Sequence, residues 1–192
     1  FKILELTYKD DNKEHSWTER KIAFMAHMRN MCLQRTLNFD GEENIEKEDN
    51  DYCFMLDSDI IIKDGKILRH LINLDKEIIS EVFWAKWNNA KDKNVISLPN
   101  VWINGGYFIT NKFLDTLLIK GVYKVGGLGA ITLINKSAIK KGFNYTRVEF
   151  LPREIMGEDR DACCRASVLG IELWADTYFT PKHLDGPDDL KK

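Results

Sequence analysis

The stretch Tyr52-Cys53-Phe54-Met55-Leu56-Asp57-Ser58-Asp59-Ile60-Ile61-Ile62 carries the clearest indication of the fold. It opens with an apolar run of strand length, and the apolar pattern resumes at Ile60 after the Asp-Ser-Asp break. Open α/β sheets bind their ligands beyond the carboxyl ends of their strands. We therefore expect Asp57 and Asp59 at the ligand-binding edge of a sheet.

Helical and strand patterns alternate along the rest of the chain. Helices are predicted over residues 16–37, 66–74, 111–119, 135–142 and 158–169, with Ser16 and Asn111 as caps. Strands are predicted over residues 2–7, 52–56, 60–62, 77–84, 95–98, 130–134 and 171–174. Polar loops are expected over 9–15, 39–50, 88–94 and the C-terminal tail. This alternation predicts an α/β sheet with helices on its faces, in a single domain over residues 1–192.

The charge balance excludes several classes of partner. Lys and Arg total 28 against 30 Asp and Glu, so the net charge of −2 provides no general attraction for nucleic acid or anionic membrane. No apolar run approaches the ~18 to 20 residues that cross a bilayer, and no signal peptide is visible at Phe1. The four cysteines show no Cys-x-x-Cys spacing. We expect a reduced, cytoplasmic protein without a transmembrane segment, and peripheral membrane attachment stays open.

Asp57 and Asp59 are the strongest candidates for chemistry. Two desolvated carboxylates repel each other unless a cation lies beside them, and hard oxygen ligands select Mg²⁺, Mn²⁺ or Ca²⁺. Such a metal can bridge to phosphate oxygens and stabilise a leaving diphosphate. The alternative is a strand that ends in an Asx-type turn, for which Asp-Ser-Asp is equally suitable.

Two further segments offer acidic or basic groups. Glu158 and Asp159 open a helix, where they cap free amide groups or, alternatively, orient and deprotonate an acceptor hydroxyl. His183 lies in a polar stretch, where a histidine is usually exposed but can also bind a cation or a diphosphate.

The remaining candidates are a basic helix position and a glycine-rich segment. Arg29, beside Asn30, can pair with a phosphate or form an ordinary salt bridge. Gly126 and Gly127 allow a substrate to approach the backbone closely, although a turn between strands explains them equally well.

The order of these motifs resembles that of the GT-A glycosyltransferases, especially family 2 and the Anp1-like mannosyltransferases, over most of the chain. The motifs are Arg29-Asn30, the strand and DxD-like motif in 51–60, Leu98-Pro99-Asn100-Val101-Trp102, Gly126-Gly127-Leu128-Gly129-Ala130, Gly157-Glu158-Asp159-Arg160-Asp161 with Arg165 and Gly170, and a closing His183. Each motif is weak alone, and the ordered set is more specific.

The resemblance implies a Rossmann-like mixed sheet flanked by helices. Members of this fold usually begin with a strand-helix-strand unit that builds the nucleobase pocket, and we expect the covered residues to depart from the family by lacking it, because residues 1–9 are similar to a later strand. It implies a sugar transfer from a UDP- or GDP-sugar to a saccharide or other hydroxyl acceptor. The implied roles are Mn²⁺ or Mg²⁺ binding by Asp57, Asp59 and His183, donor binding by Arg29, Asn30, Asp57, Gly126 and Gly127, and catalysis by Asp159 or Glu158.

Two other classes of function remain as alternatives. A nucleotidyltransferase would use paired aspartates for attack on phosphorus, and it predicts a glycine- and lysine-rich phosphate loop near the first strand, which is not seen here. A non-catalytic carbohydrate-binding or assembly module of the same fold predicts loss of the acidic motifs, whereas the carboxylates at 57, 59, 158 and 159 are all present.

Overall fold

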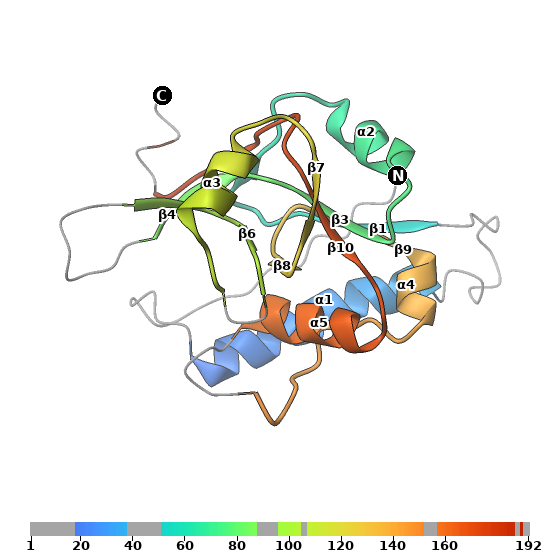
Figure 1. The fold of residues 1–192 in the computed structure, drawn as a ribbon. Helices are drawn as coiled ribbons and strands as arrows, with labels where there is room; N and C mark the ends of the chain where they lie inside the picture. The colour runs from blue at the N-terminus through green and yellow to red at the C-terminus, as the bar shows by residue number, and fades with distance from the viewer. Residues whose placement is uncertain are drawn as a thin grey trace.

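A mixed five-stranded sheet forms the centre of the protein (Figure 1), in a computed structural model that describes residues 18–37, 51–87, 96–104, 107–151, 157–186 and 189. The strand order is β1 (Tyr52–Met55), β9 (Thr132–Asn135), β3 (Ile78–Glu81), β10 (Leu173–Asp176) and β7 (Val122–Val125). β3 and β10 are parallel, and the other neighbouring pairs are antiparallel. The predicted α/β fold with a mixed sheet is therefore confirmed.

Helices cover both faces of this sheet, because its strands are apolar on both faces. α1 (Glu19–Leu37), α4 (Lys136–Lys140) and α5 (Glu158–Val168) gather on one face, and α2 (Ile67–Asn73) lies on the other (Figure 1). The core is divided accordingly: Ile78 packs in the cluster that α1, α4 and α5 share, and Ile79 packs in the cluster with α2. α3 (Asn111–Leu117) adds Leu117 to the first cluster.

Three small two-stranded sheets extend the structure around one edge of the central sheet. They pair β2 (Ile60–Ile61) with β11 (Lys182–His183), β4 (Trp84–Trp87) with β5 (Ile96–Pro99), and β6 (Val101–Trp102) with β8 (Gly127–Leu128). β1, β3 and β10 run in the same direction, and β2, β4 and β11 follow them in the chain. The carboxyl ends of these three central strands thus share the edge at which the sequence places its aspartates.

Most predicted elements are confirmed within a few residues, and four predictions need correction. Residues 77–84 form two strands, because Val82 N–H pairs with Asp176 O while Phe83 N–H donates to Asn100 Oδ1, and the chain leaves the central sheet there. Thr110, not Asn111, caps α3, since its extended backbone lets Oγ1 accept from Phe113 N–H. The predicted tail contains β11, and β6, β7 and β8 were not predicted as strands.

Several predictions fall on residues that the structure does not describe. They are the strand at 2–7, the loop at 9–15, the Ser16 cap, the acidic loop at 39–50 and the insert at 88–94. The single-domain boundaries and the missing first strand-helix-strand unit also stay predictions. None of the helices in the described segments combines the length and the hydropathy needed to span a membrane.

Candidate functional site

Arg29 is placed in the interior by the periodicity of α1. The buried positions of this helix recur at spacings of three and four residues, and they are Ile22, Ala26, Arg29, Leu33 and Thr36. The Arg29 side chain is only 7% exposed. A buried guanidinium requires charged or hydrogen-bonding partners, so the surroundings of Arg29 define the centre of the candidate site.

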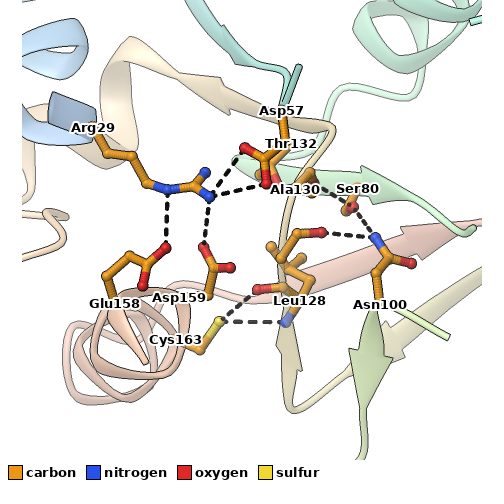
Figure 2. Close-up of polar contacts among 11 residues, drawn as sticks. Arg29, Asp57, Ser80, Asn100, Leu128, Ala130, Thr132, Glu158, Asp159 and Cys163 are labelled. Carbon is orange, nitrogen blue, oxygen red and sulfur yellow. Dashed lines mark hydrogen bonds and ion pairs between the residues drawn. The ribbon is translucent and has the colours of Figure 1, made fainter. Parts of the chain in front are cut away.

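Three carboxylates from two distant segments converge on the Arg29 guanidinium (Figure 2). Nη2 lies 3.1 Å and 3.3 Å from the two Asp57 carboxylate oxygens. Nε lies 3.4 Å from Glu158 Oε1, and Nη2 lies 3.8 Å from Asp159 Oδ1. The turn after β1 and the amino-terminal end of α5 are therefore joined through one arginine of α1.

The carboxylates around Arg29 outnumber its positive charge. Burial raises the pKa of Glu158, although Arg29 opposes the shift. Burial likewise raises the pKa of Asp159 to about 7, and the nearby Glu158 and Asp57 carboxylates contribute to the rise. Like charges in a poorly solvated site favour uptake of a proton or a cation, so this cluster is suited to exchange protons near neutral pH.

Asp159 is the more accessible of the two carboxylates on α5. Its side chain is 24% exposed, whereas that of Glu158 is 5% exposed. Gly129 makes room for it, because a Cβ at this position would lie 2.5 Å from Asp159 Oδ2. A substrate hydroxyl can thus reach Asp159 more readily than Glu158.

Asp59 and His183 form a second group beside the first. Pairing of β2 with β11 sets His183 opposite Ile60, and Leu184 N–H donates to Asp59 O at 2.8 Å. His183 Nε2 then lies 3.5 Å from Asp59 Oδ2. Burial raises the pKa of Asp59, and His183 opposes this rise.

The described residues contain no group of three or more His, Cys, Asp or Glu side chains arranged to hold a metal ion by themselves. Asp57 is turned towards Arg29, which leaves Asp59 and His183 as the nearest pair of donors. Mg²⁺ is commonly held by one or two carboxylates, waters and substrate phosphates rather than by a full set of protein ligands. The donor set fits a cation that arrives with a diphosphate.

The other sequence-predicted donor residues have structural partners. Asn30 Oδ1 accepts from Tyr145 N–H at 2.8 Å, and its Nδ2 donates to Thr146 Oγ1 at 3.2 Å. A Cβ at Gly126 would lie 1.9 Å from Ile103 O, and one at Gly127 would lie 1.9 Å from Trp102 Nε1. Packing alone therefore explains these three residues, and their donor-binding role stays a prediction.

Sequence reasoning missed the role of Asn100, which connects the backbone at Gly129 to β3. Figure 2 shows its contact with Ser80. Its Nδ2 donates to Ser80 Oγ, Glu81 O and Gly129 O, the last at 2.7 Å. Asn100 lies between β5 and β6 in a segment that the motif comparison singled out, but a single asparagine in an apolar run gave no signal for three simultaneous contacts.

Sequence reasoning also missed a second acidic pair at the same sheet edge. Glu81 and Asp176 end β3 and β10, are fully buried, and face each other in the register. Glu81 Oε1 accepts from Phe179 N–H, and Asp176 Oδ2 lies 3.0 Å from His70 Nε2 of α2. Burial raises the pKa of Glu81 to about 9, with Asp176 adding to the rise. Glu81 therefore retains its proton at neutral pH.

Comparison with known proteins yields one informative relative and no matching family model. The chain is similar to procollagen-lysine,2-oxoglutarate 5-dioxygenase of Drosophila melanogaster, with 28% identity over 147 residues. The match covers 73% of this chain and 18% of that protein, so the chain spans less than a fifth of the curated relative. That relative is an enzyme by name.

Proposed function

We propose that the chain is a GT-A-type glycosyltransferase that moves a sugar from a UDP- or GDP-sugar to a hydroxyl acceptor with the help of Mn²⁺ or Mg²⁺. The main support is the convergence of the predicted motifs. The turn after β1 holds Asp57 and Asp59, β11 holds His183 and α5 holds Asp159, and these three separate parts of the chain lie around the carboxyl edge of the sheet. This is the edge at which α/β sheets bind ligands.

Asp159 is the residue best suited to act as a general base. Its pKa, raised to about 7 chiefly by burial, matches the pH at which proton transfer is most effective. In the proposed reaction the acceptor hydroxyl gives its proton to Asp159 as its oxygen bonds to the anomeric carbon. The bond from that carbon to the diphosphate oxygen breaks, and the nucleoside diphosphate leaves with the electron pair. Asp159 has this role only if the anomeric centre is inverted.

The cation would be held by Asp59 and His183, with Asp57 beside them. When bound, it would offset negative charge on the leaving diphosphate as a Lewis acid. Arg29 was predicted to contact a phosphate or to form a salt bridge, and the salt bridge is the contact seen, while its donor-binding role stays a prediction. Its guanidinium pairs with the carboxylates of Asp57 and Glu158, so it holds the two acidic segments together.

The name of the Drosophila relative raises an oxygenase activity as a second candidate. Non-haem iron oxygenases bind iron through two histidines and one carboxylate. In the part of the chain that the structure describes, His183 is accompanied by Asp59 and Asp185 and not by a second histidine. The donor set therefore favours a cation–diphosphate complex.

The test is calorimetric titration of UDP and GDP into the full chain with and without Mn²⁺, on the wild type and on Asp59→Asn. We expect binding that requires Mn²⁺ and is lost in Asp59→Asn, because this variant removes one charged ligand. Asp115→Asn, at an exposed position of α3, is the matched control and is expected to bind as the wild type does.

Three results would count against the proposal. Absence of UDP and GDP binding with and without Mn²⁺ favours the non-catalytic module. Nucleotide binding that is unchanged by Mn²⁺ and by Asp59→Asn would show that no metal at Asp59 helps to hold the nucleoside diphosphate. Release of pyrophosphate from an added nucleoside triphosphate would favour the nucleotidyltransferase alternative.

A further inference from the structure

Asp185 contacts the His183 ring on the side that faces away from Asp59. Its Oδ1 lies 2.8 Å from His183 Nδ1, and the same oxygen accepts from Lys86 N–H at 2.8 Å. Asp185 N–H donates to Asp189 Oδ2 at 2.9 Å, which fixes the backbone of this residue as well. Asp185 is therefore held at its backbone N–H and at one carboxylate oxygen, Oδ1.

The two nitrogens of the His183 ring have different surroundings. The 2.8 Å separation at Nδ1 is that of a hydrogen bond, whereas the 3.5 Å from Nε2 to Asp59 Oδ2 is beyond the usual range. A carboxylate accepts but does not donate, so the contact at Nδ1 requires a proton on that nitrogen. In the neutral ring this leaves a lone pair on Nε2, directed to the Asp59 side.

Phe83 fixes the plane of the same ring. The two rings are stacked at 5.3 Å between centroids, with an interplanar angle of 3°. Phe83 is itself anchored, because its side chain is buried and its N–H donates to Asn100 Oδ1. The tautomer and the orientation of His183 are thus set by two different elements of the fold.

We propose that Asp185 is a positioning residue that keeps His183 as the Nδ1–H tautomer, with Nε2 available as a ligand beside Asp59. This inference rests on the proposed function for the identity of the cation, but the state of the ring can be measured without it. A carboxylate that accepts from the distal nitrogen of a metal-binding histidine raises the basicity of the ligand and fixes its direction. The spacing His183-Leu184-Asp185 is the only trace of this arrangement in the sequence.

The first measurement is long-range ¹H–¹⁵N NMR of the full chain with labelled histidine, at pH 8.5 and without metal, about two pH units above the pKa of free histidine. We expect the wild-type His183 signals of the Nδ1–H tautomer. Asp185→Ala should lose that tautomer, because the acceptor is gone. Asp185→Asn should restore it, since Lys86 N–H directs the amide oxygen towards the same place. The His70 signals, from α2, report whether each variant is folded.

The second measurement is the affinity for Mn²⁺ in the presence of UDP or GDP, followed by electron paramagnetic resonance. We expect Asp185→Ala to weaken it by ~10–100-fold and Asp185→Asn by much less. A wild-type ring with its proton on Nε2, or a folded Asp185→Ala protein with unchanged His183 signals and Mn²⁺ affinity, overturns the inference. If the tautomer changes as expected but the wild type binds no Mn²⁺, the role of Asp185 stands and the proposed metal site fails.

Discussion

Replacement of Glu81 by Gln should make the protein more stable at alkaline pH. Glu81 is fully buried beside Asp176, and its pKa is raised to about 9 mainly by that burial. Between the unfolded pKa of 4.5 and the folded pKa of about 9, the folded protein holds a proton that the unfolded chain has released. The stabilisation that this proton contributes is therefore fully present below pH 4.5, and it is lost as the pH rises from 4.5 to about 9.

The magnitude follows from the one proton involved. A difference of one bound proton changes the free energy of unfolding by ~1.4 kcal/mol per pH unit. From pH 5.5 to pH 8 the Glu81 contribution should fall by ~3 kcal/mol. Gln stays neutral, and its amide can donate a hydrogen bond as the protonated acid does, so the variant should not show this loss. Its free energy of unfolding relative to that of the wild type should therefore be ~3 kcal/mol higher at pH 8 than at pH 5.5.

Urea unfolding at half-unit steps from pH 5.5 to pH 8.5 measures this difference directly. Other groups titrate in both proteins, so the informative quantity is the gap between the two curves. Glu149→Gln, at an exposed loop position, should follow the wild type at every pH. Parallel curves for Glu81→Gln and the wild type would refute the buried, protonated state of Glu81.

Three further variants test the contacts around the candidate site. Arg29→Met should cost ~3–5 kcal/mol in urea unfolding at pH 7, because it leaves buried carboxylates without their cation, and a loss under ~1 kcal/mol would contradict the ion pairs. Asn100→Ala should cost ~1–3 kcal/mol for each buried group left without a partner, such as Phe83 N–H and Gly129 O, and thermal unfolding would show it as a lower Tm. Gly129→Ala should displace the Asp159 carboxylate and lower kcat while nucleotide affinity is retained; an unchanged kcat would remove Asp159 from the proton transfer.

The sequence predicted the sheet and its helices where the apolar pattern was unambiguous. The run at 52–56 became β1, and the acidic start at Glu158 became the amino-terminal end of α5. The sequence prediction was wrong after Glu81. The apolar pattern predicted one strand up to Trp84, whereas the chain leaves the central sheet there and enters the sheet of β4 and β5. That break depends on a hydrogen bond to Asn100, which lies at a distance no local pattern reports.

The candidate site was predicted as a set of residues but not as a set of contacts. The order of the motifs predicted that Asp57, Asp159 and His183 belong to one site. It did not predict which side chains each of them contacts. Arg29, expected to bind phosphate or an acidic residue, is occupied by carboxylates because the helix periodicity buries it. Asp185 was missed because an acidic residue two positions after a histidine in a polar tail carries no pattern that indicates a contact between the two side chains.

The most direct test of the central claim is release of UDP or GDP from UDP- and GDP-sugars by the full chain with Mn²⁺ and simple saccharide acceptors. The account predicts Mn²⁺-dependent release and formation of a glycoside, with the rate reduced by ~10²–10⁴-fold in Asp159→Asn. No release from any donor above the Asp159→Asn background, in a protein that binds the nucleotide, would contradict it and show a binding module without turnover.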